Sequence, residues 1–415
     1  MMTPISSTLF RKTISIILAG GQGERLYPLT KDRSKPAVPF GGKYRVIDFT
    51  LSNVINSGFR KVYLVTQYKS QSLDTHIREG WSFLNGELGE FIYSIPPQFR
   101  TANHWYQGTA DAIFQNLHIL QDERPEHIVI LSGDHIYKMD YLKMLQYHIA
   151  KKADLTIAGI EVEKNLAHQF GVMVVNDSNE IIEYQEKPQE PKPLPHKEDT
   201  CYVNMGIYIF NAEAIARVLI DDAKKKDSQH DFGKNIIPSM LGNYKVQAYN
   251  FEDENKTARP YWRDIGTIDS YYESSMDLVS VSPVFNLYDS DWPIRTYQGQ
   301  YPPAKNVFSE SFEGGRMGTA IDSLVSGGCI ISGGKVERCL LSPNVRIHSY
   351  SHVEESILFN NVSVGRHAKI RKAIIDKNVR IPENFEIGYN IEEDKKKFFV
   401  TPSGIVVVSK NTQLL

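Results

Sequence analysis

The sequence predicts two folds in succession: an α/β domain with a mostly parallel, dinucleotide-binding-like sheet, and then a left-handed parallel β-helix of hexapeptide-type repeats. Between residues 14 and about 280, continuous apolar runs alternate with helix-like segments. Such alternation is typical of parallel strands that are covered by helices on both faces. From residue 324 onward, aliphatic residues instead recur at intervals of 17. A unit this short cannot bury a core alone, so successive units are expected to stack.

The strands of the first domain are expected where the apolar runs lie. These runs are 14–18, 61–66, 127–131, 155–160, 172–175 and 206–210. One helix is expected to begin near Thr109, with Thr109 itself as the N-cap, and another is expected over 141–150. Because ligands bind beyond the carboxyl ends of strands in such sheets, the residues that follow 14–18 and 127–131 are candidates for a site.

The repeat in the second domain has four aliphatic positions per unit. The units are Leu341, Val345, Ile347, Val353; then Leu358, Val362, Val364, Ile370; then Ile375, Val379, Ile381, Ile387; one unit earlier, the same spacing selects Leu324, Gly328, Ile330 and Val336. Asn344, Asn361 and Asn378 recur in the same register. A proline-marked segment precedes these units, so we expect a first domain over 1–288, a linker over 289–305 and a β-helix over 306–415.

The composition argues against several classes of function. The net charge of −2 provides no strong field for binding nucleic acid or an anionic membrane. No apolar run is long enough to cross a bilayer, and the first one ends in glycines rather than in a signal-peptide cleavage site. Cys201, Cys329 and Cys339 are scattered without metal-type spacing. We therefore expect a cytoplasmic protein with no nucleic-acid or membrane partner.

A glycine-rich loop after the first apolar run has the features of a polyphosphate site. The N–H groups of Gly20, Gly21 and Gly23 can converge on an anion, and Arg25 and Lys35 add positive charge nearby. The loop is neither a Walker A loop nor a dinucleotide fingerprint, because it lacks a residue that each of these motifs requires. The short glycine motif alone could be an ordinary turn, but the longer string through Lys35 is far more specific.

Two aspartates are candidate metal ligands. Asp134 follows the apolar run 127–131, and Asp264 lies in the string Y-W-R-D-I-G-T. A carboxylate at the end of a buried strand can hold Mg²⁺ against phosphate oxygens, although such an Asp is more often a turn or cap residue. Lys187 could bind the phosphate of a sugar phosphate, but a solvated surface lysine is the usual case.

Six longer strings carry a resemblance to a known family. They are K-P-A-V-P-F-G-G-K-Y-R-V-I-D-F at 35–49, L-S-N-V-I-N-S-G at 51–58, W-Y-Q-G-T-A-D-A at 105–112, G-D-H-I-Y-K-M-D-Y at 133–141, H-D-F-G-K at 230–234 and Y-W-R-D-I-G-T at 261–267. Over nearly its whole length the chain resembles the sugar-phosphate nucleotidyltransferases, and most closely the bacterial glucose-1-phosphate adenylyltransferase (ADP-glucose pyrophosphorylase) family. The resemblance implies transfer of the adenylyl group of ATP to α-D-glucose 1-phosphate for glycogen biosynthesis, under allosteric control.

The resemblance also implies a role for each candidate residue. The implied ATP site is Gly20, Gly21, Gly23, Gln67 and Thr109; the implied catalytic residues are Arg25, Lys35 and Asp134. The implied glucose 1-phosphate site is Tyr106, Gly171, Glu186, Lys187, Asn204 and Asp231. Mg²⁺ is implied on Asp134 and Asp264, and phosphorylated effectors are implied at Arg33, Arg45, Lys377 and Lys410. The assembly implied is a homotetramer.

Three positions depart from the family pattern. Glu24 replaces a small hydroxyl residue, so its charge must point away from the phosphates; Asn204 replaces a common Ser. Asp32 stands where enteric-type enzymes have an activator-binding Lys, so the usual effector, fructose 1,6-bisphosphate, is not assumed.

Two other hypotheses stay open. One is a catalytically silent regulatory subunit of a heteromeric enzyme, against which the presence of Arg25, Lys35, Asp134 and Lys187 argues. The other is an acyltransferase activity of the β-helix, for which the repeats are few.

Overall fold

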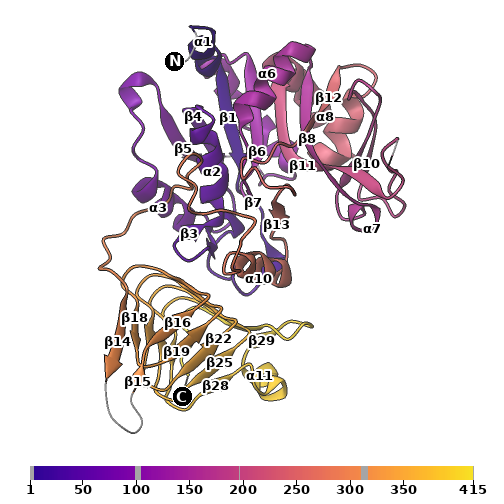
Figure 1. The fold of residues 1–415 in the computed structure, drawn as a ribbon. Helices are drawn as coiled ribbons and strands as arrows, with labels where there is room; N and C mark the ends of the chain where they lie inside the picture. Colours follow the sequence, from indigo (N-terminus) through magenta and orange to yellow (C-terminus); the bar gives the residue numbers. More distant parts are fainter. Residues whose placement is uncertain (1–3, 99–103, 196, 310–315, 415) are drawn as a thin grey trace.

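The computed structural model describes residues 4–98, 104–195, 197–309 and 316–414. The N-terminal domain is built on one sheet with helices on both faces, and the C-terminal domain is a coil of short strands packed beneath it (Figure 1). The strands of the large sheet are β1 Thr13–Leu18, β4 Lys61–Val65, β5 Phe91–Ile95, β6 His127–Ser132, β8 Leu155–Glu163, β9 Gly171–Val175, β10 Ile181–Glu186, β11 Thr200–Asn211 and β12 Val246–Asn250.

The sheet combines a parallel part with two strands of opposite direction, β10 and β11. Its order is β10-β9-β11-β6-β1-β4-β5, and β8 pairs with both β11 and β12. β1 runs parallel to β4 and to β6, as the continuous apolar runs predict, and β4 runs parallel to β5, a strand that those runs did not predict. β11 runs antiparallel to β6, β8 and β9. The predicted fold class is confirmed, and the alternation of apolar runs did not reveal the antiparallel strands β10 and β11.

Eleven helices are present in the described residues. They are α1 Pro4–Arg11, α2 Val46–Asn56, α3 Gln71–Gly80, α4 Thr109–Phe114, α5 His118–Glu123, α6 Tyr141–Lys151, α7 Lys164–Ala167, α8 Ala212–Ala223, α9 Ile237–Met240, α10 Ile268–Asp277 and α11 Ile391–Lys397. Short 3₁₀ turns lie at Glu24–Leu26, Lys35–Ala37 and Gly86–Leu88, and a π-helical turn lies at Phe232–Ile236. The remaining short strands of this domain are β2 Pro39–Phe40, β3 Tyr44–Arg45, β7 His135–Tyr137 and β13 Trp262–Asp264.

The prediction that Thr109 is an N-cap was wrong by one residue. Gly108 is the N-cap of α4, and Thr109 is the first helical residue. A Cβ at position 108 would lie 2.2 Å from the carbonyl oxygen of His230, so the close approach of that segment requires glycine there. The Thr109 hydroxyl is therefore free to contact Asp231, at 3.1 Å, instead of capping the helix.

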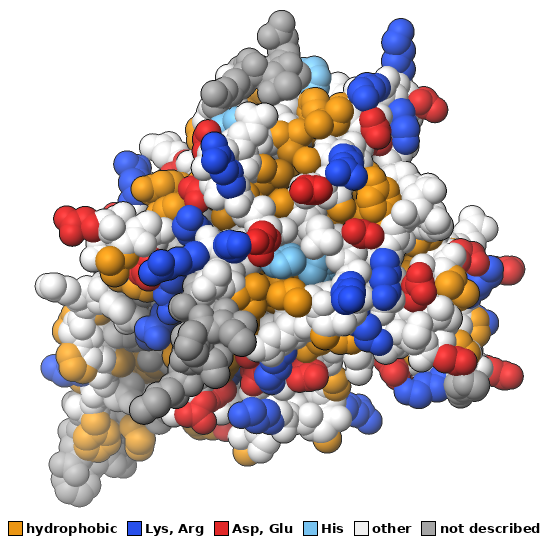
Figure 2. All heavy atoms as spheres, turned by 90° about the horizontal axis from the view of Figure 1, so that it is seen from above, with side chains coloured by type: hydrophobic (Ala, Val, Ile, Leu, Met, Phe, Trp, Pro, Cys, Tyr) orange, Lys and Arg blue, Asp and Glu red, His pale blue; other side chains and the backbone are white. Residues whose placement is uncertain are grey.

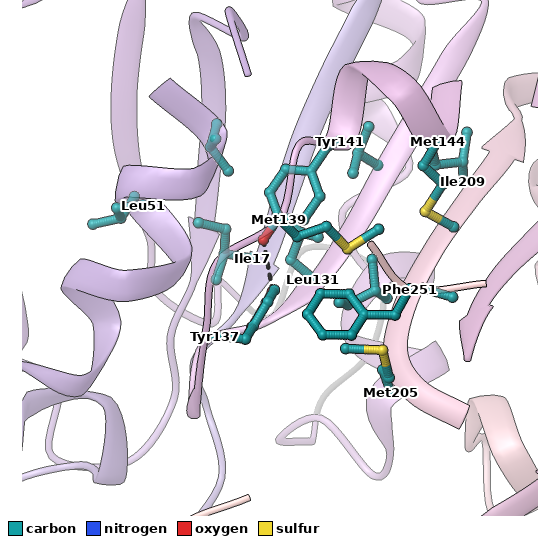
Figure 3. Packing of buried hydrophobic residues seen from close by; sticks show 14 of the residues in the cluster. Ile17, Leu51, Leu131, Tyr137, Met139, Tyr141, Met144, Met205, Ile209 and Phe251 are labelled. Carbon is teal, nitrogen blue, oxygen red and sulfur yellow. Dashed lines mark hydrogen bonds between the residues drawn. The ribbon is translucent and has the colours of Figure 1, made fainter. Parts of the chain in front are cut away.

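Alternate residues of the central strands bury the two faces of the sheet. On one face Ile17 and Leu131 pack with Leu51 of α2 and Met144 of α6, together with Phe251 (Figure 3). On the other face the neighbouring strand residues pack against helices α4 and α8. The core therefore holds the carboxyl ends of β1 and β6 rigidly side by side, which matters because the predicted loop and Asp134 follow them.

The C-terminal domain is a left-handed parallel β-helix with three sheets. The sheets are β14-β18-β21-β24-β27, β16-β19-β22-β25-β28 and β17-β20-β23-β26-β30, with β15 and β29 as antiparallel additions. The strands are β14 Lys305–Ser309, β15 Arg316–Met317, β16 Thr319–Ile321, β17 Leu324–Val325, β18 Ile330–Ser332, β19 Lys335–Glu337, β20 Leu340–Leu341, β21 Arg346–Ile347, β22 His352–Glu354, β23 Ile357–Leu358, β24 Ser363–Val364, β25 Lys369–Arg371, β26 Ala373–Ile375, β27 Arg380–Ile381, β28 Glu386–Ile387, β29 Phe399–Val400 and β30 Val406–Val408.

The predicted 17-residue repeat is confirmed for the three later units. Leu341, Leu358 and Ile375 are partners on adjacent strands. The asparagines form a ladder, in which Asn344 donates to Asn361 at 3.3 Å and Asn361 donates to Asn378 at 3.0 Å. Their side-chain amides bond from one coil to the next, so stacking itself satisfies them.

The backward extension of the repeat was wrong by one residue at three of its four positions. Leu324 pairs with Leu340, and Ile331, rather than Ile330, pairs with Ile347. The turn that contains Gly333 and Gly334 is one residue shorter than its successor, so only Val336 returns to the predicted register. Gly328 consequently lies beside Asn344, has φ of +77°, and occupies the left-handed position of the asparagine ladder.

The two domains share a buried apolar interface. Phe40, Phe49 and Tyr271 of the N-terminal domain belong to the same core cluster as Leu340 and Ile374 of the β-helix. The chain between the domains, residues 289–298, is fastened to α2, because buried Asp48 accepts a hydrogen bond from Thr296 at 2.6 Å. Apolar packing between the domains and the attachment of the connecting segment to α2 therefore hold the two domains together.

Charge and hydropathy over the surface follow the composition. The face seen in Figure 2 intersperses basic and acidic side chains without a large area of either sign. No helix among the described residues has the length and apolar character required to span a bilayer.

Candidate active site

Two aspartates far apart in the sequence meet at the carboxyl edge of the sheet. Asp134 follows β6 directly, and Asp264 ends β13. β13 pairs antiparallel with β7, which places Asp264 opposite His135. The proximity of the two predicted metal ligands therefore depends on a two-stranded ladder that the sequence did not reveal.

Lys35 lies between the two carboxylates. Its Nζ is 2.7 Å from Asp134 Oδ2 and 3.1 Å from Asp264 Oδ1, and its side chain is buried. Burial alone would lower the pKa of Lys35, but the two carboxylates outweigh it and raise the pKa above its usual value. Burial raises the pKa of Asp134, and Lys35 and His135 more than reverse this, so that carboxyl ionises well below its usual range. The site is a charged cluster at neutral pH.

The glycine loop adjoins this cluster. Gly23 has φ of +64° and would place a Cβ 3.1 Å from both Lys35 and Thr30, so only glycine fits comfortably. Thr30 Oγ1 donates to the carbonyl of Gly23 at 2.9 Å. A Cβ at Gly266 would lie 3.1 Å from Arg25 Nη2 and 3.3 Å from Asp264 Oδ2, which places the Arg25 guanidinium beside the carboxylates.

The carboxylates and His135 form a possible metal centre. Ligand atoms of Asp134, His135 and Asp264 all lie within 4.8 Å of one another. Carboxylate oxygens suit Mg²⁺, which usually takes one or two protein carboxylates and completes its shell with water and phosphate oxygens. His135 was not among the predicted residues; its position beside Asp134 in the string G-D-H was the available signal.

A second group of predicted residues gathers around Tyr184, which the sequence analysis missed. Its hydroxyl donates to Glu186 at 3.1 Å and accepts from Asn204 at 3.0 Å. Gly171 lies against it, since a Cβ there would be 1.9 Å from the Tyr184 hydroxyl oxygen. Burial raises the pKa of Tyr184 well above its usual value, so the hydroxyl stays protonated. Nothing in the pattern of residues around Tyr184 marked it as more than a strand aromatic.

Asp231 and Thr109 border this second group. Asp231 accepts from the backbone of Gly233 at 2.9 Å, and a Cβ at Gly233 would lie 2.4 Å from Glu186 Oε2. Gly206, in the bulge of β11 after Asn204, lies within 3.6 Å of His135 by the same measure. The Tyr184 group and the aspartate centre are therefore neighbours on the same edge of the sheet.

The other predicted residues lie at the margins. Gln67 follows β4 and lies against Gly20, and its side-chain oxygen accepts from the backbone N–H of Tyr106 at 3.1 Å. The hydroxyl of Tyr106 also accepts a hydrogen bond from the side-chain amide of Asn116 at 3.0 Å. Lys187 is largely exposed and has φ of +49°. Gly21 has open space around its Cα.

The four predicted effector residues do converge between the domains. Arg33 Nη2 donates to Asp376 Oδ1 at 2.9 Å, and both side chains are buried. The other nitrogen, Arg33 Nη1, is buried without a hydrogen-bond partner in the described structure. Burial, with Arg45 and Arg33 nearby and Lys410 a smaller contributor, lowers the pKa of Lys377 to about 7. The residues form a positive cluster that Asp376 only partly neutralises.

Comparisons with known proteins agree with this geometry. A nucleotidyl transferase family model matches residues 14–281, and a model of GlmU-like C-terminal hexapeptides matches residues 302–408. The chain is 54% identical over 405 residues to the glucose-1-phosphate adenylyltransferase of Koribacter versatilis, covering 97% of this chain and 96% of that protein. It is 52% identical over 403 residues to the enzyme of the same name from Methylococcus capsulatus, covering 97% and 94% of the two chains. The chain is 51% identical over 408 residues to the glucose-1-phosphate adenylyltransferase of Rhodopirellula baltica, covering 98% of this chain and 92% of that protein.

Proposed function

The chain belongs to the glucose-1-phosphate adenylyltransferase family, and from this premise we propose how its residues transfer the adenylyl group of ATP to α-D-glucose 1-phosphate. The observation that carries the proposal is the cluster of Lys35, Asp134 and Asp264 beside the glycine loop. A phosphate oxygen of the sugar phosphate attacks the α-phosphorus of ATP in line. The bond from that phosphorus to the bridging oxygen breaks, and its electron pair leaves with pyrophosphate. Because the attacking oxygen is already an anion, no general base is required.

We propose that catalysis rests on positioning and on charge. The glycine loop, with Gly20, Gly21 and Gly23, holds the phosphates of ATP, while Gln67 contacts the adenine. Arg25 and Lys35 stabilise the negative charge that spreads over the α-phosphate and the leaving group. Asp134 and Asp264 would hold Mg²⁺, which supplies Lewis-acid stabilisation of the same charge. The fit of Mg²⁺ is supported by the two carboxylates, whose ligand atoms lie within 4.8 Å of each other.

We propose that the Tyr184 group binds the sugar. Glu186, Asn204 and Asp231 present acceptors and donors suited to glucose hydroxyls, and the Tyr184 hydroxyl orients the first two. Lys187 is placed next to Glu186 and free to approach the phosphate of the sugar phosphate. Tyr106 would close the pocket on the Gln67 side, and Thr109 would close it on the Asp231 side.

We propose that the positive cluster between the domains binds phosphorylated effectors. Support comes from Arg33, whose unpaired Nη1 is buried, and from Lys377, whose neighbours Arg45, Arg33 and Lys410 are all cationic. Asp376 is the negative charge that acts on Lys377, and it raises the pKa that the basic neighbours lower. An anion placed there would relieve repulsion that the protein alone leaves uncompensated.

Anion binding at this cluster should weaken as the pH rises through about 7. Lys377, with its pKa lowered to about 7, is mostly protonated at pH 6 and mostly neutral at pH 8. A bound anion raises that pKa, so the affinity for sulfate should be up to about tenfold higher at pH 6 than at pH 8. Sulfate does not itself titrate in this range, and calorimetric titration measures its affinity directly. In Lys377→Met the pH dependence should disappear; equal affinities at the two pH values in the unmodified protein would contradict the prediction.

We further propose a role in glycogen biosynthesis, in the cytoplasm, as a homotetramer. The free, buried cysteines Cys201, Cys329 and Cys339 are compatible with a reducing compartment.

The deciding experiment is pyrophosphate release by the purified chain. It is run with glucose 1-phosphate and Mg²⁺ and, in turn, ATP, UTP, dTTP and GTP. We expect release with a strong preference for ATP. Preference for another nucleotide would overturn the substrate, and no release with any of them, even with effectors present, would favour the silent regulatory subunit.

A further inference from the structure

Lys69 is a cation that lines a cavity together with residues of the glycine-loop segment. The cavity has a volume of about 440 Å³, which lies within the usual size range of ligand pockets. Four of its lining residues come from the glycine-loop segment: Gln22, Glu24, Tyr27 and Thr30. The other two are Tyr68 and Lys69, which follow Gln67. Lys69 is the one basic residue of this lining.

The ammonium group of Lys69 is not neutralised by a carboxylate. Its Nζ donates to the backbone carbonyl of Thr30 at 2.8 Å, and no ion pair of Lys69 occurs among the described residues. Glu24, which lines the same cavity, likewise has no ion pair in the described structure. A neutral carbonyl satisfies one of the three N–H donors of a lysine and none of its charge. The charge is therefore available to an anion.

Two successive hydrogen bonds join Lys69 to the phosphate-binding part of the loop. The first is the bond to the Thr30 carbonyl, and the second runs from Thr30 Oγ1 to the carbonyl of Gly23 at 2.9 Å. Gly23 has the left-handed φ of +64° that turns the loop. Thr30 thus connects Lys69 to the loop that is proposed to hold the polyphosphate.

The two residues that precede Lys69 are held in place by contacts with Tyr106 and Trp105. Gln67 accepts a hydrogen bond from Tyr106, and the Tyr68 ring stacks on Trp105 with an interplanar angle of 9°. Lys69 itself has φ of +47°, which is uncommon for a residue with a side chain. A backbone outlier held by its neighbours is a recognised feature of functional sites.

We propose that Lys69 is a further residue of the ATP site, which binds the terminal phosphates of ATP and hence the pyrophosphate that leaves. This inference rests on the proposed function. If Gln67 contacts the adenine and Lys35 the reacting phosphate, the terminal phosphates extend along the glycine loop toward Lys69. When the bond to the α-phosphorus breaks, the electron pair moves onto pyrophosphate, and Lys69 holds the terminal phosphates equally well before and after this step without transferring a proton. Glu24 lines the same cavity but forms no ion pair with Lys69 among the described residues, so the charge of Lys69 is not used by that carboxylate.

The test is Lys69→Met, which keeps the length of the side chain and removes its charge. The KM for ATP should rise by about tenfold to a hundredfold, as for loss of a hydrogen bond to a charged group. The KM for glucose 1-phosphate should change by less than about twofold, and kcat by less than about threefold. In the reverse direction, the KM for pyrophosphate should rise by the same factor as that for ATP. Lys69→Arg should restore most of the loss, because charge is what the role requires.

Lys31→Met is the matched control. Lys31 is an exposed cation next to Thr30 in the chain and does not line the cavity, so its KM values should match those of the unmodified protein. A purely structural role for Lys69 would lower the melting temperature without a selective rise in the KM for ATP. If Lys69→Met folds poorly, Lys69→Gln keeps a donor for the Thr30 carbonyl and answers the same question. Unchanged KM values for ATP and pyrophosphate would overturn the inference, whereas an inactive unmodified protein would overturn the proposed function instead.

Discussion

Replacing Asp134 by Asn is expected to lower kcat for pyrophosphate release by about a thousandfold or more. Asp134 Oδ2 lies 2.7 Å from the Lys35 ammonium, and the same carboxylate is one of the two proposed for Mg²⁺. The loss of one preorganised electrostatic contact typically costs about a hundredfold to a thousandfold, and the loss of a metal ligand adds to it. Asn has the same shape but carries no charge, so it can neither balance Lys35 nor bind a divalent cation as strongly.

The fold should survive this change. The Asp134 side chain is 28% exposed, and Asp264 remains 3.1 Å from Lys35 to balance its charge. The melting temperature, followed by circular dichroism, should therefore stay within a few degrees. Asp277→Asn is the matched control, because Asp277 lies on α10 and pairs with Arg263 outside the cluster; its kcat should be nearly normal. Turnover of Asp134→Asn within tenfold of the unmodified protein would exclude the proposed catalytic role.

Replacing Asp376 by Ala is expected to destabilise the protein by about 3–5 kcal/mol. The Arg33–Asp376 pair is buried, with side-chain exposures of 4% and 1%. Removal of one partner leaves a buried charge without compensation, which is the costly way to break such a pair. Here the cost is increased by Lys377 and Arg45, whose positive charges lie close to Arg33. Urea unfolding followed by circular dichroism measures the change in the free energy of unfolding.

An exposed ion pair on the same β-helix provides the comparison. Lys369 and Glu386 lie 2.9 Å apart on adjacent strands, and both side chains are about half exposed. Exposed pairs of this kind contribute less than about 1 kcal/mol. Glu386→Ala should thus cost far less than Asp376→Ala. A similar loss in the two variants would show that the domain interface does not depend on the buried pair.

Much of the architecture could be predicted because its signals are local. The apolar run at 14–18, followed by glycines, predicts a buried strand that ends in a loop, and the structure has β1 Thr13–Leu18 followed by that loop. The 17-residue spacing predicts stacked coils, since each coil repeats the same inward positions. Patterns of this kind depend only on which face of a segment is buried, and neighbouring residues report that directly.

The local patterns failed where a single residue changed the register or the partner. The short turn at Gly333–Gly334 shifted the first coil by one position, so Gly328 joined the asparagine ladder instead of the core. Thr109 lost the cap position to Gly108 because another segment, at His230, packs against the helix start. At Gly333–Gly334 the cause was a local change in turn length, which a fixed spacing does not anticipate, whereas at Thr109 it was a contact from a segment far away in the sequence.

The fold class, the glycine loop, the repeat and the residue types of the site could all be read from local patterns in the chain. Which side chains meet depends on the folded structure. Lys35 reaches Asp264 across 229 residues, and Arg33 reaches Asp376 across 343. Tyr184 and His135 belong to the site because of the residues they contact, Glu186 for Tyr184 and the two aspartates for His135. The physical reason is that burial and periodicity are properties of one segment, whereas charge compensation and hydrogen bonding depend on contacts between segments that only the folded chain brings together.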